Sequence, residues 1–350
     1  MRRFLAPWTG DKPVFYHCGS RVVDRRRVFG ELEKEKFHEL MRRTERFTGC
    51  RAVSYSLLSN HFHMLLEVPR MPRGGISDEE LLKRLRVFFS RMFVKKVEAA
   101  LAEARMPEVV DSEAAVAKIH DRFTYRMHNL GEFMKCLLQR FTQWFNRSRR
   151  RRRSGTLWER RFSSSLVEDG TGAKAVAAYG DLNPVRAQIV KEPGNYRWSS
   201  YGEALAGGKE ARAGLVRVML CHQGVEADAK LWNQGVAEAY RRLLLEGVVE
   251  KFVELPGGGR KRVRAGMSAQ EVEREKEKCG RIDLGRMLHC RLRYFTAGVV
   301  IGSRKFVDEV FAQTRERFGA RRRTGARRMR GAASPAAGIL FSLRDLRKDV

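Results

Sequence analysis

The sequence SNHFHMLLEVP, residues 59–69, predicts a β-strand that carries two histidines one residue apart. Side chains at positions i and i+2 of a strand point to the same face, so His61 and His63 should lie side by side. The intervening Phe62 and Met64 should point to the opposite face, into a core. Two explanations are open: a pair of surface histidines on a half-buried strand, or two imidazole ligands of one divalent ion that needs a further ligand.

The apolar pattern on either side of this stretch predicts both strands and helices. Runs rich in β-branched and aromatic residues indicate strands, and apolar residues spaced three and four apart indicate helices. In chain order, the predicted elements are a strand at 14–22, a helix at 29–48, strands at 52–58 and 61–68, helices at 81–104 and 130–145, a strand at 157–167 and a helix at 170–182. Asn183-Pro184 should end the last helix, because the residue before proline is disfavoured in the α conformation. This order predicts an α+β fold in which an antiparallel sheet carries its helices on one face.

Composition divides the chain into three parts. Residues 1–205 hold the predicted sheet, and residues 206–267 form an ambiguous segment that ends in a linker, LPGGGRKRVRAGMS, at 255–268. Residues 268–350 are predicted to be a basic helical region, with two helices around Gly298–Ser303. That region is either a DNA-binding module or a basic appendage that packs on the core.

The charge of the chain indicates a polyanionic partner. Lys and Arg number 70 against 41 Asp and Glu, a formal net charge of +29. Nucleic acid is favoured over a membrane surface, because the sequence has no apolar run of membrane-spanning length and no evident amphipathic anchor. The six cysteines are scattered without a C-x-x-C pair, and the N-terminal residues lack the apolar run of a signal peptide. We therefore expect a cytoplasmic protein that binds nucleic acid.

An arginine run follows the helix predicted at 130–145. Consecutive arginines repel one another unless an anion lies among them. The run has no interleaved Asn, Gln or aromatic residues for base readout or stacking, so it should contact the DNA backbone rather than the bases. The alternative is a solvated charge run. The predicted DNA-contacting residues are Arg147, Arg149, Arg150, Arg151, Arg152 and Arg153, with Arg160 and Arg161 downstream.

A second polar group lies in AAYGDLNPVRAQIV, residues 177–190. Tyr179 and Asn183 are four residues apart and would share one face of a helix. Asn183 offers a neutral oxygen as third ligand for Mg²⁺ or Mn²⁺ beside the two imidazoles. Tyr179 offers a hydroxyl that can attack phosphorus and form a covalent phosphotyrosine. The alternatives are a tyrosine that only packs on the sheet and an asparagine that only caps the helix.

Three further residues compete for roles in this site. Tyr196 and Tyr201, in NYRWSSY, are rival nucleophiles, although packing is favoured for both. Glu67 should share the face of the two histidines and could reach the ion, but a solvated strand end is favoured.

Four motifs in this order resemble the REP-associated tyrosine transposases, which are single-tyrosine transposases of the HUH endonuclease superfamily. The motifs are LLSNHFHMLLEVP, GTLWERRFSSSLVE, AYGDLNPVRA and NYRWSSY, and the resemblance covers about residues 10–205. It implies a ferredoxin-like sheet with His61 and His63 as ligands of a divalent metal. It also implies Tyr179 as the nucleophile and Asn183 as the residue that completes the metal site.

The function implied by the resemblance is metal-dependent cleavage and transfer of single-stranded DNA. The expected substrate is a foldback hairpin of REP type, attacked to give a 5′-phosphotyrosine and a free 3′-hydroxyl. No nucleotide cofactor is expected, because the sequence has no P-loop motif. A metallohydrolase that uses an activated water is one alternative, and a catalytically silent DNA-binding or regulatory protein that retains the fold is another.

One departure bears on activity. Relatives often read YIHLNP where this chain reads YGDLNP. Gly180 should weaken the helix that presents the tyrosine by up to ~1 kcal/mol. Asp181 is expected to add a negative charge near the DNA phosphate.

Overall fold

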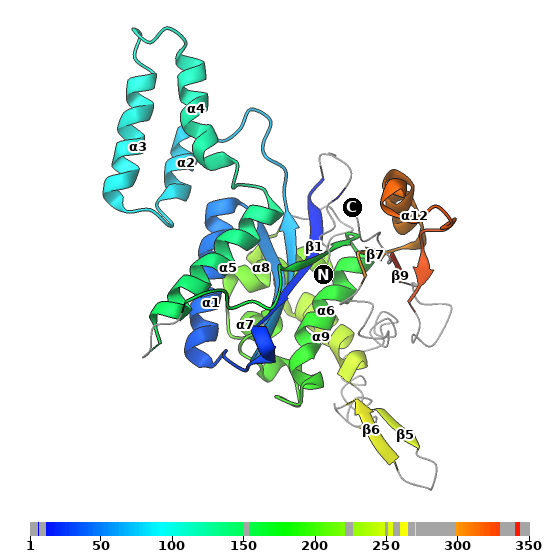
Figure 1. Ribbon diagram of the computed structural model, residues 1–350. Helices are drawn as coiled ribbons and strands as arrows, with labels where there is room; N and C mark the ends of the chain where they lie inside the picture. The colour runs from blue at the N-terminus through cyan, green and yellow to red at the C-terminus, as the bar shows by residue number, and fades with distance from the viewer. Residues whose placement is uncertain are drawn as a thin grey trace.

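The structure is a computed structural model of the 350-residue chain (Figure 1). It describes residues 6, 12–149, 154–220, 227–248, 251–254, 260–264, 270, 298–329 and 340–343. Arg150, Arg151, Arg152 and Arg153 lie outside the described residues, as does much of the predicted basic C-terminal region. Among the described residues, no helix is both long and apolar enough to span a membrane.

A seven-stranded, mostly antiparallel sheet lies at the centre, with strand order β2-β3-β1-β4-β7-β9-β8. Its strands are β1 (Val14–Arg21), β2 (Arg51–Leu57), β3 (His61–Val68), β4 (Ser163–Val167), β7 (Val300–Gly302), β8 (Arg327–Arg328) and β9 (Phe341–Leu343). Each neighbouring pair is antiparallel except β4 and β7. The predicted α+β class is confirmed, and β3 has the bounds that the sequence indicated.

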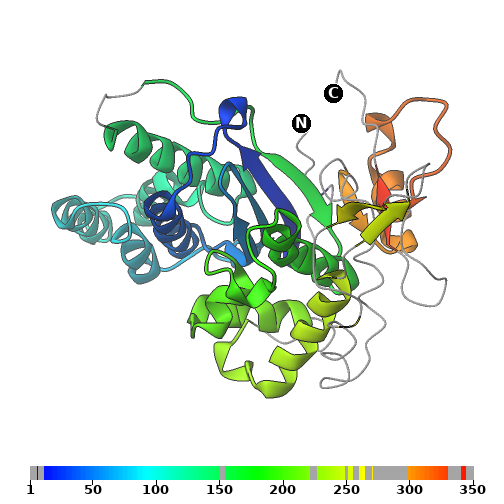
Figure 2. The same cartoon turned by 90° about the horizontal axis from the view of Figure 1, so that it is seen from below.

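Helices cover both faces of this sheet (Figures 1 and 2). α1 (Glu31–Thr48) and α5 (Leu130–Arg147) pack on one face, which we call the aromatic face. α6 (Thr171–Arg186), α8 (Lys209–Met219) and α9 (Gln234–Val248) pack on the other, the histidine face. The prediction of helices on one face was wrong. α6 is buried on all sides and is itself rich in small apolar residues, so its sequence lacks the one-sided pattern of a surface helix.

α6 also runs through the point where the sequence predicted its end. Pro184 lies in its last turn, and the helix continues to Arg186. The backbone N–H of Ala187 still donates to the carbonyl of Asn183 at 2.8 Å. Burial of the apolar residues on both sides of Pro184 outweighs the weak local preference against this conformation.

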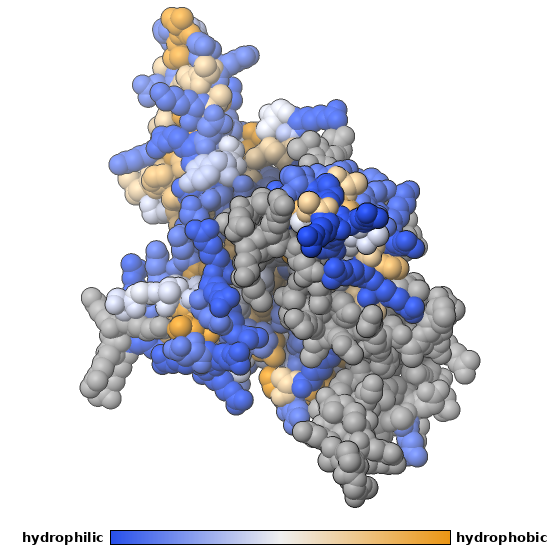
Figure 3. All heavy atoms as spheres, turned by 45° about the vertical axis from the view of Figure 1, so that its right-hand side comes forward, coloured by the Kyte–Doolittle hydropathy of each residue, from blue (hydrophilic) through white to orange (hydrophobic). Residues whose placement is uncertain are grey.

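Three helices form an arm that projects from the sheet (Figure 1). α2 (Asp78–Leu85), α3 (Arg91–Ala104) and α4 (Ser112–Thr124) share a small apolar core of their own. The Ser77 side chain caps the start of α2, and the single helix predicted over 81–104 is two helices, α2 and α3. Hydrophobic atoms lie at the tip of the arm in Figure 3, where the connection from α3 to α4 carries exposed side chains.

The described C-terminal residues extend the sheet rather than forming only helices. β7 occupies the position predicted for the junction of two helices, and α12 (Arg304–Gln313) follows it. Part of the predicted linker is also a strand, because β6 (Arg260–Arg264) pairs with β5 (Lys251–Glu254). Division of the chain at residue 205 stays a prediction, although α8 and α9 share the core of α6.

Candidate active site

The two faces of β3 carry chemically different side chains. His61 and His63 lie on the histidine face with ring centroids 5.2 Å apart, and both are half-buried. Phe62 and Met64 are buried in the core of the aromatic face. Two imidazoles therefore stand next to each other beneath α6.

A neighbouring amide orients the ring of His61. Its Nδ1 lies 2.6 Å from Oδ1 of Asn60, an acceptor, so Nδ1 carries the hydrogen and Nε2 the lone pair. Burial, helped by the charge of Arg21, lowers the pKa of His61 to about 4. The ring is therefore neutral at neutral pH, as a metal ligand must be.

His63 contacts a third histidine that the sequence did not single out. Its Nδ1 lies 3.1 Å from Nε2 of His17, and the two rings stack with centroids 5.1 Å apart. Burial lowers the pKa of His63 well below its usual range, and the neighbouring His17, His61 and Arg21 lower it further. His63 is therefore also neutral at neutral pH.

α6 brings Tyr179 onto these rings. Its ring centroid lies 5.4 Å from that of His63 and 5.9 Å from that of His17, with near-perpendicular planes in both pairs. The Arg186 guanidinium lies over the tyrosine ring, 5.2 Å from its centroid. Arg186 is seven residues from Tyr179, so two turns of one helix present both groups to the same place.

Two opposing effects act on the Tyr179 phenol. Burial raises its pKa, because the phenolate loses its solvation. The charges of Arg186 and Arg21 and the adjacent amide of Asn183 lower it. The site thus keeps the phenol protonated at rest while holding two cations where a phenolate or a phosphate would be stabilised.

Asn183 lies one turn after Tyr179 and is only 8 % exposed. The terminal atom assigned as Nδ2 is buried without a hydrogen-bond partner among the described residues. Because the two ends of an asparagine amide are assigned from their hydrogen bonds, this end can equally be the oxygen. An orphaned amide end is costly in a core and is satisfied when a ligand binds there.

These features fit a divalent cation, with donors from both β3 and α6. The two histidines are neutral, and His61 presents the lone pair of its Nε2. The described part of the chain contains no group of three His, Cys, Asp or Glu side chains placed to hold a metal. Asn183, whose amide end is buried beside Tyr179, is the further side chain that could offer an oxygen to a cation here.

The departure at residues 180–181 does not act as the sequence suggested. Asp181 points away from Tyr179 into the core and is fully buried. Its Oδ1 accepts from the Tyr201 N–H at 3.1 Å, and its Oδ2 accepts from the Tyr240 hydroxyl at 2.5 Å. Burial raises its pKa to about 7, against the lowering effect of these bonds. The prediction that Asp181 adds a negative charge near the DNA phosphate is wrong. Asp181 follows Tyr179 by two residues, about half a helical turn, so the two side chains point to opposite sides of α6.

Glu67 is also not available to a cation. Its carboxylate is fully buried, not solvated as the sequence suggested. Oε1 accepts from Arg217 Nε at 2.9 Å, and Oε2 accepts from Arg51 Nε at 2.8 Å. Both oxygens are thus committed to structural ion pairs.

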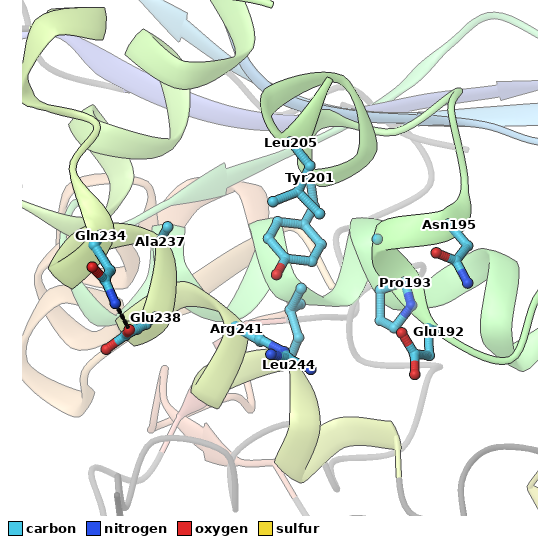
Figure 4. Close-up of a pocket in the computed structure, with 11 residues that line it drawn as sticks. Glu192, Pro193, Asn195, Tyr201, Leu205, Gln234, Ala237, Glu238, Arg241 and Leu244 are labelled. Atoms are coloured by element: carbon cyan, nitrogen blue, oxygen red, sulfur yellow. Dashed lines mark hydrogen bonds between the residues drawn. The ribbon is translucent and has the colours of Figure 1, made fainter. Parts of the chain in front are cut away.

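The two rival tyrosines have other surroundings. The Tyr196 hydroxyl donates to the carbonyl of Leu57 in β2. Tyr201, at the start of α7 (Ser200–Leu205), lines a cavity of about 260 Å³ between that helix and α9, and Figure 4 shows its ring pointing into it. Neither hydroxyl is directed at the histidine pair.

The described part of the arginine run is partly held by the protein. Arg149 forms an ion pair with Glu33 at 2.5 Å and stacks over the Phe145 ring, 3.9 Å from its centroid. Arg147 is exposed. Arg149 is therefore less free to bind a phosphate than the sequence suggested.

Arg160 and Arg161 are exposed beside the end of β1. The preceding Glu159 donates its backbone N–H to the carbonyl of Arg21 at 2.9 Å, and Arg21 pairs with His61 in the sheet. These two arginines thus lie at the same end of the sheet as the histidine pair.

Three residues of this site were missed from the sequence: His17, Arg21 and Arg186. The same-face rule applied to residues 14–22 would have grouped His17 with Arg21. It could not have shown that this strand pairs with β3.

Comparison with known proteins adds little. No protein-family model and no curated protein matches the chain. One solved structure, of a REP-associated tyrosine transposase bound to a REP hairpin, aligns with 59 % of this chain and 85 % of that one, at 11 % identity and a TM-score of 0.33. A likeness at that TM-score carries no argument about fold or function.

Proposed function

We propose that this protein is a metal-dependent endonuclease and strand transferase of single-stranded DNA. In this proposal it belongs with the single-tyrosine transposases of the HUH superfamily and acts on foldback hairpins of REP type. The observation that carries the proposal is the contact of Tyr179 with His63, since a tyrosine, two histidines and a guanidinium converge from β1, β3 and α6.

The order of the first four strands supports the same assignment. The order β2-β3-β1-β4, with α1 after β1 and α5 before β4, is the order expected of a ferredoxin-like sheet and so supports the proposal. In the proposed protein, the strands of that sheet present the histidines and α6 adds the tyrosine above them.

The proposed reaction is an in-line exchange at phosphorus. The Oη of Tyr179 attacks the scissile phosphodiester, a P–Oη bond forms, and the P–O3′ bond breaks. The phenolic proton passes to solvent, and the departing 3′-oxygen takes up a proton from solvent to become a hydroxyl, so the exchange leaves the number of protons unchanged. Arg186 and Arg21 stabilise the developing negative charge. Rejoining reverses the exchange with another 3′-hydroxyl, so no nucleotide cofactor is consumed.

His61, His63 and Asn183 would hold a divalent cation, Mg²⁺ or Mn²⁺. When bound, it would polarise the scissile phosphate. The neutral imidazoles and the partnerless amide end support this part of the proposal.

The deciding experiment is incubation of the full chain with labelled single-stranded hairpins and Mn²⁺. Wild type should give a protein–DNA adduct that survives denaturation. Tyr179→Phe keeps the ring packing but removes the attacking oxygen, so it should form no adduct while hairpin binding stays within about twofold.

Tyr201→Phe is the matched control, because it removes a hydroxyl from another buried tyrosine and should leave the adduct in place. Adduct formation by Tyr179→Phe at the wild-type rate would sink the assignment. Cleavage without attachment would instead indicate a water nucleophile.

A catalytically silent DNA-binding protein is the second candidate. Burial of the Tyr179 phenol favours it, because burial raises the pKa of the group that would have to attack. It predicts hairpin binding with no adduct from wild type at any Mn²⁺ concentration.

A further inference from the structure

The His17 side chain contacts His63, which is diagonal to it across the strand pair, rather than Leu65 directly opposite. β1 pairs with β3 so that His17 faces Leu65 and Gly19 faces His63. A Cβ on Gly19 would lie 3.0 Å from the Phe62 carbonyl oxygen and 3.5 Å from His63 Nδ1. The missing side chain leaves the space in which the two imidazoles stack.

The contact between His17 and His63 restricts the tautomer of both rings. Two neutral imidazoles can share one hydrogen bond only if one nitrogen donates and the other accepts. If His17 Nε2 donates, His63 carries its own hydrogen on Nε2 and cannot bind a metal through that atom. If His63 Nδ1 donates, its Nε2 keeps a lone pair.

His61, on the same face of the sheet, has the second of these arrangements, with the hydrogen on Nδ1 and the lone pair on Nε2. There, Asn60 Oδ1 can only accept, so His61 Nδ1 donates and Nε2 keeps its lone pair. A cation bound by both histidines through Nε2 requires the matching tautomer in His63. His17 Nε2 is the acceptor within 3.1 Å that can supply it.

We propose that His17 is a positioning residue, which accepts the hydrogen of His63 Nδ1 and so presents His63 Nε2 to a divalent cation. His17 does not act as a ligand through Nε2, because that nitrogen is directed at His63. Its ring also lies edge-on to Tyr179, so one side chain supports both the ligand and the nucleophile.

The first test reads the tautomer without metal or DNA. Long-range ¹H–¹⁵N correlation spectra of the full chain distinguish a hydrogen on Nδ1 from one on Nε2, and His63→Ala assigns the signal. Wild-type His63 should carry its hydrogen on Nδ1. A hydrogen on Nε2 would overturn the proposal.

The second test measures Mn²⁺ affinity by calorimetry. His17→Phe removes the acceptor and should weaken binding roughly 10–100-fold, the usual cost of losing such a partner. His17→Gln keeps an acceptor at the position of Nε2 and should bind within about threefold of wild type. His120→Phe, in the arm, is the control, because His120 contacts Asp78 there and should not affect Mn²⁺.

Equal Mn²⁺ affinity in His17→Phe and wild type would overturn the proposal, and a loss that His17→Gln does not restore would do so as well. The inference rests on the proposed function only through the cation. A wild type that binds Mn²⁺ and shows the expected tautomer but forms no DNA adduct would refute strand transfer and leave the role of His17 standing.

Discussion

The two faces of the central sheet have opposite chemistry although the same strands form both. On the aromatic face, Phe37 is fully buried and lies 4.9 Å from Phe62 and 5.2 Å from Phe141, measured between ring centroids. On the histidine face, three imidazoles and a tyrosine meet under a helix rich in alanine.

Neighbouring positions of β3 show how sharp this division is. Phe62 belongs to the aromatic core, and His63 contacts His17 and Tyr179 on the other side. One face supplies apolar burial, which stabilises the fold, and the other tolerates buried polar groups, which cost stability. The comparison teaches that stability and chemistry should respond to different substitutions.

The largest change in stability should come from the aromatic face. Phe37→Ala removes a ring from a closely packed aromatic cluster and should lower the free energy of unfolding by about 3–5 kcal/mol. Urea denaturation monitored by circular dichroism measures it. Tyr179→Phe, which removes one hydroxyl from the histidine face, is the comparison and should cost about 1 kcal/mol or less. If Tyr179→Phe lowers the free energy of unfolding more than Phe37→Ala does, the aromatic face is not the main source of stability.

The next effect concerns the buried carboxylate behind Tyr179. The folded-state pKa of Asp181, raised to about 7, exceeds its unfolded value of about 3.9. The folded chain therefore holds this proton more tightly, and the resulting stabilisation is complete below pH 4 and lost as the pH rises to 7.

Asp181→Asn should remove this pH dependence. The free energy of unfolding of the variant minus that of wild type should be about 2–4 kcal/mol larger at pH 8 than at pH 4. Denaturation midpoints across this range measure the difference. Asp121→Asn, on the exposed side of α4, is the control and should follow wild type. Parallel curves for wild type and Asp181→Asn would contradict the assignment.

A smaller effect is expected on DNA affinity. Replacing Arg147, Arg160 and Arg161 with Ser should flatten the slope of log K against log salt by about 2, if each contacts one phosphate. Cognate and scrambled hairpins should weaken alike, because backbone contacts carry little sequence information. Fluorescence anisotropy at several salt concentrations measures both.

The matched control for these arginines removes three exposed cations from the arm, through Arg91→Ser, Lys95→Ser and Lys96→Ser. It should leave the slope unchanged. Loss of cognate binding alone, with the slope preserved, would mean that the arginines read sequence or shape.

The smallest effect concerns the glycine next to Tyr179. A Cβ at Gly180 would meet only Ser54 Oγ, at 3.8 Å, so Gly180→Ala should stabilise α6 by about 0.5–1 kcal/mol. At Gly214, on the same face, a Cβ would lie 2.5 Å from the Val53 carbonyl, so Gly214→Ala should destabilise. Thermal denaturation of both variants checks the pair, and a destabilised Gly180→Ala would show that α6 packs more tightly than described.

Several features could be predicted from the sequence because they depend on local geometry. The period of two in residues 59–69 was enough to separate the histidines from the core residues of β3. The capping serine of α2 and the bounds of β3 follow from neighbouring residues alone. Tyr179 and Asn183 share a face because four residues make about one helical turn.

The rest depended on contacts between distant segments. The pairing of β1 with β3 brings His17 to His63, 46 residues away in sequence. Tyr201 and Tyr240 hold the Asp181 carboxylate in the core, and β7 joins β4 across more than a hundred residues. Local periodicity reports which side of an element is apolar, but not which element covers it, because that choice is made by packing among segments that the sequence separates.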